Sequence, residues 1–353
     1  MAAPDRSSSP DPIGWGIVGP GEIASVFARA LQRSGAGEIR GVLGRSLERS
    51  QRYADTFGGT PRQSLDDLLG DDRIQAVYIA TPHPMHFAAA KRALGARKAV
   101  LCEKPMTTSA PETSELIELS YWTGTPLIEA WMYRTHPQIA RAIDLIKSGA
   151  IGSVRRMSAA FGVACETSTP DRLRLPELGG GVIYDIGGYP LSALTMLAHA
   201  LGHSFDDLTL EDANGSLIES GVEIDAEASL TIRGAIEANV ACSFRRPLGL
   251  FVEIVGDSGT LSLPSAFLPG GDREGKRGEI TLTTPSGRVT EFPASEHCCY
   301  SMEAIEVARL IESGGIEPAW PMVGHAESIA IATLIDAWRG IVLEPGSTTH
   351  ERG

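Results

Sequence analysis

Short apolar runs alternate with amphipathic segments in the first part of the chain. The apolar runs predict buried strands at residues 13–18, 39–43, 76–80, 99–102 and 126–130. Between them, apolar positions at helical spacing predict helices at residues 23–31, 47–57, 64–69, 87–94 and 111–122. Buried strands that alternate with helices predict a doubly wound parallel α/β sheet.

The pattern changes after residue 134. A helix is predicted at 136–148, a strand at 153–161, a charged loop at 171–178 and a helical pattern over 179–201. Antiparallel strands are then predicted at 227–232, 235–244, 250–255, 259–263, 279–284 and 288–292, and helices at 301–313 and 325–340. We therefore expect a first domain at 13–134, an α+β domain at 135–345, and tails at 1–12 and 346–353.

The composition narrows the possible partners and the cellular compartment. The 31 Lys and Arg against 44 Asp and Glu give a net charge of −13, which argues against a nucleic-acid or anionic-membrane partner. The 5 cysteines form no C-x-x-C pair and have no histidine cluster beside them, so we expect reduced thiols, no metal site and a cytoplasmic protein. Residues 1–12 hold no apolar segment, so we expect no signal peptide or membrane helix there.

The first predicted strand leads directly into a glycine motif, Gly19-x-Gly21-x-x-Ala24, and then into a helix. Gly19 permits a tight turn, Gly21 lets backbone amides approach a pyrophosphate, and Ala24 allows close packing of helix and strand. The phosphates would lie at the helix N-terminus, beside Glu22 and Ile23. The motif predicts a dinucleotide site.

The end of the second strand indicates which dinucleotide binds. An Asp or Glu about 20 residues after the glycine motif would bind the ribose 2′-hydroxyl of NAD. This chain has Arg45 and Ser46 there, which offer a guanidinium and a hydroxyl to a 2′-phosphate. We therefore predict NADP(H); a solvated Arg45 at a helix start is the alternative.

Polar residues follow the later strands of the predicted parallel sheet. Ligands bind beyond the carboxyl ends of such strands, so these residues should converge on one crevice. They are Thr81, Pro82 and His86 after the third strand, Glu103 and Lys104 after the fourth, and Tyr133 and Arg134 after the fifth. We expect Lys104 near the nicotinamide, with a plain surface charge as the alternative, and expect His83 to be a surface loop residue.

A carboxylate and a phenol stand four residues apart in the glycine-rich segment that follows. If this segment is helical, Asp185 and Tyr189 share one face and could act as an acid/base pair. A phenol is a poor base at neutral pH unless a nearby cation, here Lys104, lowers its pKa. The alternative for Tyr189 is a buried tyrosine tethered by its hydroxyl. Arg172 and Arg174 lie on the preceding loop and are further substrate-binding candidates.

These motifs resemble, in order and spacing, the glucose-fructose oxidoreductase/inositol dehydrogenase/MocA family over residues 13–343. They are the glycine motif, Thr81-Pro82-x-x-x-His86, Glu103-Lys104-Pro105, Tyr133-Arg134-x-His136-Pro137 and Gly179-Gly180-Gly181-x-x-x-Asp185-Ile186-Gly187-x-Tyr189. The tyrosine at position 189 resembles the branch of the family that contains dimeric dihydrodiol dehydrogenase and the xylose dehydrogenases, which carry a tyrosine at this position. The resemblance implies a Rossmann domain, a large open antiparallel sheet that pairs with another subunit, and a cis peptide before Pro105.

The residues and the resemblance together predict an NADP-dependent enzyme. It would move a hydride between nicotinamide and a hydroxyl or carbonyl carbon of a sugar or cyclic polyol, with Tyr189 handling the proton. The alternatives are a keto-sugar reductase, a trans-dihydrodiol dehydrogenase and a non-catalytic NADP-binding sensor. The specific substrate, the reaction direction and the choice between dimer and tetramer stay open.

Overall fold

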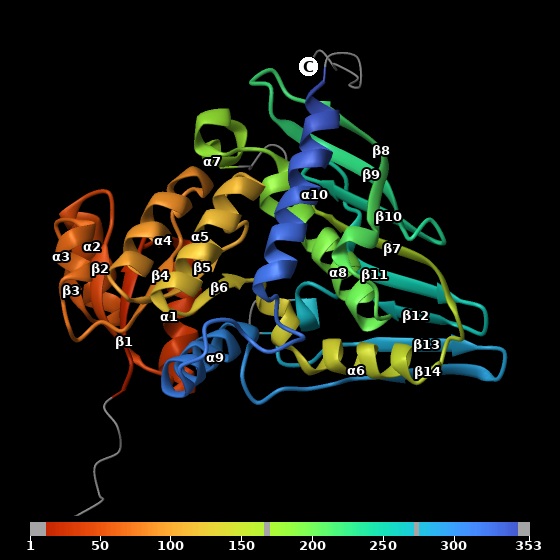
Figure 1. Ribbon diagram of the computed structural model, residues 1–353, viewed down its shortest axis with the longest axis horizontal. Helices are drawn as coiled ribbons and strands as arrows, with labels where there is room; N and C mark the ends of the chain where they lie inside the picture. Colours follow the sequence, from red (N-terminus) through yellow and green to blue (C-terminus); the bar gives the residue numbers. More distant parts are fainter. Residues whose placement is uncertain (1–11, 166–169, 272–274, 345–353) are drawn as a thin grey trace, which may run out of the picture.

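The computed structural model describes residues 12–165, 170–271 and 275–344 of the chain. It contains a 6-stranded sheet of order β3-β2-β1-β4-β5-β6 and an 8-stranded sheet of order β14-β13-β12-β11-β7-β10-β9-β8. Figure 1 shows the two sheets beside each other, each with helices packed against it. The predicted fold class, a parallel doubly wound sheet with a mainly antiparallel open sheet, is confirmed.

Every strand pair of the first sheet is parallel. All residues of β1, β4 and β6 are buried, which explains why these strands are continuous apolar runs in the sequence. The strands are β1 (Gly14–Val18), β2 (Glu38–Leu43), β3 (Thr60–Pro61), β4 (Ala76–Ile79), β5 (Ala99–Glu103) and β6 (Leu127–Ala130). The 2-residue strand β3 lies outside the predicted set.

The helices of the first sheet begin at side-chain caps. Ser46, Ser64 and Ser109 each accept a hydrogen bond from the backbone amide three residues later, a contact that stabilises a helix by about 1 kcal/mol. The helices are α1 (Glu22–Ser34), α2 (Leu47–Phe57), α3 (Leu65–Leu69), α4 (His86–Gly95) and α5 (Ala110–Thr123), with the short turn η1 (His83–Met85) before α4.

The end of the chain completes the layers around the first sheet. Helices α3, α4 and α5 pack on one face of the sheet, and α1 and α2 pack on the other. They are joined there by α9 (Cys299–Ser313), whose Ala304, Val307 and Leu310 enter the same core as Trp15 and Tyr78. The first sheet therefore has a complete core only when α9 returns to it.

The second sheet is mixed: β7 and β10 are parallel, and its other pairs are antiparallel. Its strands are β7 (Val154–Gly162), β8 (Leu208–Leu217), β9 (Glu223–Ile232), β10 (Ile236–Ser243), β11 (Gly249–Gly256), β12 (Thr260–Leu263), β13 (Ile280–Thr284) and β14 (Gly287–Glu291). Strand β8 was not predicted, because it is mostly polar and only one of its 10 residues is buried.

Helices cover one face of the second sheet. They are α6 (Pro137–Lys147), α8 (Gly188–Ala200) and α10 (His325–Leu343), and in Figure 1 they lie in front of its strands. The opposite face carries a shallow hollow lined by small and polar residues, among them Ser158, Glu227, Ser229 and Asn239. The predicted charged loop at 171–178 is wrong in part, because α7 (Asp171–Arg174) and the turn η4 (Pro176–Leu178) form there.

Three further predictions can be compared with the described residues. None of the 5 cysteines, all within the described ranges, forms a disulfide. Within those ranges no group of at least 3 His, Cys, Asp or Glu residues is arranged to hold a metal ion. No helix in the described part of the chain is long and apolar enough to cross a membrane.

Arg134 does not line a crevice, so that prediction is wrong. Its side chain is fully buried in the turn η2 (Met132–Thr135) and forms two hydrogen bonds with the carboxylate of Glu327, at 2.9 and 3.2 Å. It also donates to the carbonyl oxygens of Pro321 and Ser192, at 2.7 and 2.9 Å. A guanidinium with these partners joins η2 to α8 and α10 and has no access to substrate.

We expect Arg134→Gln to lower the free energy of unfolding by about 3–5 kcal/mol, because it leaves the Glu327 carboxylate buried without its cation. Denaturant titration measures the change. Arg155→Gln is the control, because Arg155 pairs with Asp257 while 63% exposed and should change stability little. Equal small effects of both variants would show that the buried pair does not stabilise the fold.

Candidate active site

The glycine turn is held tightly between two strand ends of the first sheet. Gly19 has φ +92°, and a Cβ there would lie 2.6 Å from the carbonyl oxygen of Ala80. Its amide donates to the Leu43 carbonyl at 2.9 Å. A residue with a side chain fits neither this conformation nor this space, which places the start of α1 directly beside Thr81.

The N-terminus of α1 has room for a phosphate. No side chain caps this helix, and a Cβ added at Gly21 would meet no atom closer than 3.9 Å. The amides of Glu22 and Ile23 lie in the first turn, where helix amides have no partner within the helix. The nearby Thr81 hydroxyl is buried and has no hydrogen-bond partner among the described residues. These observations fit a dinucleotide.

Arginines flank the end of β2. Arg45 is exposed, and the Ser46 hydroxyl caps α2 by accepting from the Arg49 amide at 3.3 Å. The Arg49 side chain donates from Nε to the Pro20 carbonyl at 3.3 Å, so its guanidinium lies against the glycine turn. Sequence reasoning missed Arg49. The spacing in the sequence could have identified Arg49, because Arg45 and Arg49 are four residues apart, one helical turn, on either side of the Ser46 cap.

Three predicted catalytic residues come together at the end of β5. A cis peptide joins Lys104 to Pro105, as the family resemblance implied. The Lys104 ammonium donates to the Asp185 carbonyl oxygen at 2.5 Å and lies 3.7 Å from Asp185 Oδ1. It is also 5.1 Å from the centre of the Tyr189 ring. The structure therefore places Lys104, Asp185 and Tyr189 within reach of one another.

Asp185 and Tyr189 stand on either side of an irregular helix start. Asp185 lies in a π-helical turn, η5 (Ile183–Gly187), which continues into α8 with Tyr189 in its first turn. The glycines here are required by close packing: a Cβ at Gly188 would lie 2.5 Å from the Trp131 ring, and one at Gly187 would lie 3.1 Å from Cys242 Sγ. The predicted continuous helix is thus replaced by a π turn, a feature often found at functional sites.

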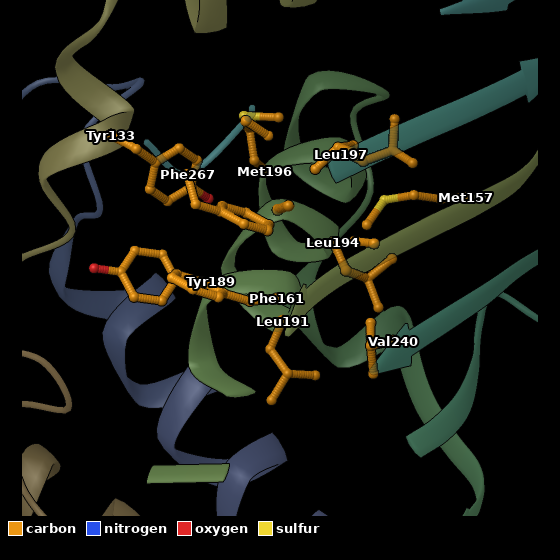
Figure 2. Packing of buried hydrophobic residues seen from close by; sticks show 14 of the residues in the cluster. Tyr133, Met157, Phe161, Tyr189, Leu191, Leu194, Met196, Leu197, Val240 and Phe267 are labelled. Atoms are coloured by element: carbon orange, nitrogen blue, oxygen red, sulfur yellow. The ribbon is translucent and has the colours of Figure 1, made fainter. Parts of the chain in front are cut away.

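The Tyr189 ring is packed among aromatic side chains. Its neighbours are Trp131, Phe161, Phe267 and Tyr133, with ring centres 5.1 to 5.9 Å away. Figure 2 shows its phenol oxygen pointing away from Phe161 and the aliphatic side chains behind it. Tyr189 is 7% exposed. The core therefore fixes the ring and leaves the oxygen at the edge of the cluster.

The electrostatics of the two groups differ. Burial would raise the pKa of Asp185, but Lys104, His83 and Arg172 outweigh burial and hold that pKa below its usual value. Burial raises the pKa of Tyr189 well above its usual value, and Tyr300 and Glu103 add to the effect. The prediction that Lys104 lowers the pKa of Tyr189 overall is wrong. Tyr189 is therefore a neutral phenol at neutral pH.

His86 and His83 occupy different places from those predicted. His86 is fully buried, and its Nδ1 and Nε2 face the carbonyl oxygens of Pro105 and Thr81 at 2.9 and 2.8 Å. It holds two strand ends together and cannot contact a cofactor directly, so its predicted binding role is wrong. His83 is buried, not on the surface, and its Nδ1 lies 3.0 Å from the Gly179 carbonyl. Burial lowers the pKa of His83 to about 3.

The glycine run before the π turn packs against both sides of the site. A Cβ at Gly179 would lie 2.8 Å from Pro84, and one at Gly181 would lie 2.3 Å from the Glu223 carboxylate. Glu223 in turn forms a buried pair with Arg339 at 2.9 Å. Glycine is therefore needed at both positions, because an ion pair and a strand-end loop fill the space of a side chain.

The remaining predicted substrate residues separate into two groups. Tyr133 is fully buried, and its hydroxyl contacts Ser192 Oγ at 2.7 Å, so the prediction that it binds substrate is wrong. Arg172 is 46% exposed and lies 3.9 Å from Asp185 Oδ1, beside the catalytic group. Arg174 is also exposed on α7, and its carbonyl accepts from the Ser220 hydroxyl. Thr81, Pro82 and Glu103 lie at the strand ends, as expected.

The chain matches known protein families over most of its length. A family described as "Oxidoreductase family, NAD-binding Rossmann fold" matches residues 13–129, and the "GFO/IDH/MocA C-terminal domain" matches residues 139–262. Together these matches cover most of both sheets and leave β13 and β14 outside. They agree with the resemblance found from the motifs.

Individual relatives are enzymes of sugars and diols. A dTDP-3,4-didehydro-2,6-dideoxy-alpha-D-glucose 3-reductase of Actinomadura kijaniata is 26% identical over 95% of this chain and 97% of its own. A D-xylose 1-dehydrogenase (NADP(+)) of Haloferax volcanii is 30% identical over 78% of this chain and 80% of its own. A trans-1,2-dihydrobenzene-1,2-diol dehydrogenase of Mus musculus is 28% identical over 92% and 95%.

Solved structures show the same fold. A 3-ketoreductase from Actinomadura kijaniata, in complex with NADP and TDP-benzene, aligns with a TM-score of 0.84 and 26% identity over 96% of this chain and 99% of its own. The same ketoreductase was also solved with a lysine or a tyrosine replaced. An aldose-aldose oxidoreductase from Caulobacter crescentus aligns with a TM-score of 0.81 at 21% identity, over 93% and 97%, and shows the fold alone.

We expect Lys104→Met to raise the pKa of Asp185 above its usual range, because His83 is neutral above a pH of about 3 and burial would then be opposed mainly by Arg172. Carbon-13 NMR titration of the Asp185 carboxyl carbon measures this pKa. Arg172→Gln should raise it less, since that guanidinium is half-exposed and 3.9 Å away. A pKa that is unchanged in Lys104→Met would contradict the assigned contact.

Proposed function

Because the chain belongs to the glucose-fructose oxidoreductase/inositol dehydrogenase/MocA family, we propose that it is an NADP-dependent oxidoreductase of sugars or related cyclic polyols. One observation carries this proposal: Lys104, Asp185 and Tyr189 meet at the carboxyl ends of strands that also present an open helix N-terminus. The names of the relatives support an enzyme of this class. Because both Lys104 and Tyr189 are in place, a sensor with a lost catalytic site is disfavoured.

The residues around the glycine turn fit NADP(H), which supplies or accepts the hydride when it is bound. Gly19 and Gly21, with the amides of Glu22 and Ile23, would hold the pyrophosphate. The 2′-phosphate would be bound by Arg45 and Ser46, with Arg49 as a third ligand. Thr81 and Pro82, with Glu103 and Lys104, would border the nicotinamide half.

Each side chain of the catalytic group has a separate task in this proposal. Tyr189 exchanges a proton with the substrate oxygen, and Lys104 donates a hydrogen bond to the same oxygen. Asp185 holds Lys104 in place and accepts from a neighbouring substrate hydroxyl. Arg172 and Arg174 contact the more distant part of the substrate.

Carbonyl reduction is the direction that we propose for this site. Burial, with Tyr300 and Glu103 adding to it, raises the pKa of Tyr189 and keeps its phenol protonated, which is the form that can give a proton to a carbonyl oxygen. Oxidation needs the phenolate, which these neighbours oppose. We therefore give a keto-sugar reductase as the second candidate function, in line with the 3-reductase among the relatives.

The open face of the second sheet supports a homo-oligomer. Strands β7, β9 and β10 carry small and polar side chains around a shallow hollow, and the covering helices lie on the other face. We propose that a second copy of the chain packs there, as a dimer or within a tetramer. The absence of disulfides among the 5 cysteines supports the expected cytoplasmic location.

We expect Tyr189→Phe to lower kcat by about 10²–10⁴-fold, because it removes the proton donor and keeps the ring. NADPH absorbance, followed across a panel of aldoses, inositols, dihydrodiols and keto-sugars, measures the rate. Tyr121→Phe is the matched control, since Tyr121 is 55% exposed on α5, away from the glycine turn and from Lys104. If Tyr189→Phe keeps the full rate, the assigned role of Tyr189 is wrong.

We expect Arg45→Gln to weaken NADPH binding by about ten- to a hundredfold and to leave NADH binding unchanged, because only NADPH carries the 2′-phosphate. Fluorescence titration with each nucleotide measures both affinities. Arg52→Gln is the control on the helix that follows Arg45, α2, where Arg52 pairs with Glu48 at the surface. Equal losses for NADPH and NADH would contradict a phosphate contact.

A further inference from the structure

Tyr184 is a buried tyrosine that the proposed reaction does not use, although it directly precedes Asp185 in the π turn η5. Its hydroxyl donates a hydrogen bond to the Thr108 carbonyl at 2.8 Å. Thr108 is the fourth residue after Lys104. The Tyr184 hydroxyl therefore joins the turn that carries Asp185 to the loop that follows Lys104.

The loop around Thr108 is held on both sides. The Glu129 side chain on β6 accepts a hydrogen bond from the Met106 amide at 2.9 Å. Asp336 on α10 accepts a hydrogen bond from the Ala110 amide at 2.7 Å. Thr108 lies between these two anchored amides, so its carbonyl oxygen has a fixed position.

The ring of Tyr184 is held by a charged neighbour. The guanidinium carbon of Arg339 lies 3.9 Å from the ring centre, a cation–π contact. Arg339 also donates to both carboxylate oxygens of the buried Glu223, at 2.9 and 3.3 Å. The ring of His83 meets Tyr184 at 66°, with the centres 6.3 Å apart. These neighbours fix the ring that carries the hydroxyl.

Helix α10 supports both partners of this hydrogen bond. Asp336 and Arg339 are three residues apart, so they share one face of the helix. Asp336 holds the loop that contains Thr108, and Arg339 holds the ring of Tyr184. A hydrogen bond between groups that are already held in place loses little conformational freedom when it forms.

The two segments that Tyr184 joins also carry the proposed catalytic side chains. The Lys104 ammonium donates to the Asp185 carbonyl oxygen at 2.5 Å and lies 3.7 Å from Asp185 Oδ1. Lys104 belongs to the first segment and Asp185 to the second. If the segments separated, this contact would lengthen.

We propose that Tyr184 is a positioning residue that sets the distance between Lys104 and Asp185. The inference rests on the proposed function, in which Asp185 holds Lys104 while Lys104 donates to the substrate oxygen. The Tyr184 hydroxyl fixes the π turn against the loop, and each catalytic side chain follows its own backbone. In this role Tyr184 contacts neither substrate nor cofactor.

Tyr184→Phe tests this role, because it removes the hydroxyl and keeps the ring beside Arg339. Burial raises the pKa of Asp185, and Lys104 is the group that most strongly opposes burial. A looser contact with Lys104 should therefore raise this pKa, by about 0.5 or more. Carbon-13 NMR titration of the Asp185 carboxyl carbon measures the change without cofactor or substrate. An unchanged pKa would overturn the proposal.

The same substitution in a Lys104→Met background separates positioning from a direct effect. There, Tyr184→Phe should leave the pKa of Asp185 as it is in Lys104→Met alone, because the cation that Tyr184 positions is gone. A rise of the same size with and without Lys104 would show that Tyr184 acts on Asp185 by another route, and the proposed role would be wrong.

Ser120→Ala is the control for the loss of a buried hydrogen bond. Ser120 is fully buried on α5, and its Oγ donates to the Thr125 carbonyl at 2.6 Å. Thr125 precedes the amino end of β6, whereas Lys104 follows the carboxyl end of the parallel strand β5. Ser120→Ala should lower the melting temperature but not change the pKa of Asp185. An equal rise of that pKa would refute a specific role for Tyr184.

Activity gives a second readout. Tyr184→Phe should lower kcat for carbonyl reduction by about three- to thirtyfold, because a small displacement of a catalytic group slows the reaction. Its Kd for NADPH, measured by fluorescence titration, should stay at the wild-type value. An unchanged kcat would contradict the positioning role. Wild-type protein that converts no sugar, polyol or carbonyl compound with NADP(H) would instead refute the proposed function, and the NMR titration would still decide whether Tyr184 sets the contact.

Discussion

The buried ion pair between Arg134 and Glu327 holds the proposed catalytic tyrosine in position. Arg134 follows β6 of the first sheet, and Glu327 lies on α10 beside the second. The same guanidinium binds the Ser192 carbonyl, and Ser192 Oγ donates to the Tyr189 carbonyl at 2.8 Å. The first turn of α8 is thereby tied to the strand ends of the first sheet. The pair therefore connects the helix that carries Tyr189 to the sheet that carries Lys104.

The proposed catalytic group combines one cation, Lys104, with several acidic side chains in a small volume. Lys104 is shared by Asp185 and Glu103, and it is the cation that keeps Asp185 ionised against the effect of burial. For Tyr189, burial and the neighbouring acids both raise the pKa, so the phenol stays neutral. Neighbouring groups are thus held in different protonation states by burial and by the placement of a single ammonium. A site with these states can give a proton and orient a substrate at once.

Helix α9 shows how the last part of the chain takes part in the first sheet. Its apolar residues Ala304, Val307 and Leu310 complete the core that also holds Tyr78. Two glycines also allow segments that are distant in the sequence to pack closely: Gly179 leaves space for Pro84, and Gly181 leaves space for Glu223. In both places the packing depends on segments that are distant in the sequence.

Local sequence patterns determined the alternation of strands and helices, the glycine turn, the strand-end position of Lys104 and the spacing of Asp185 and Tyr189. Periodicity and strand-end position depend on residues that are close in the sequence, so they can be predicted without a tertiary structure. Only the tertiary structure decided that Arg134, Tyr133 and His86 are buried and hydrogen-bonded and that His83 is not on the surface. Arg134 and Glu327 are 193 residues apart. The burial, partners and pKa of a charged side chain depend on such distant segments, and no local pattern encodes them.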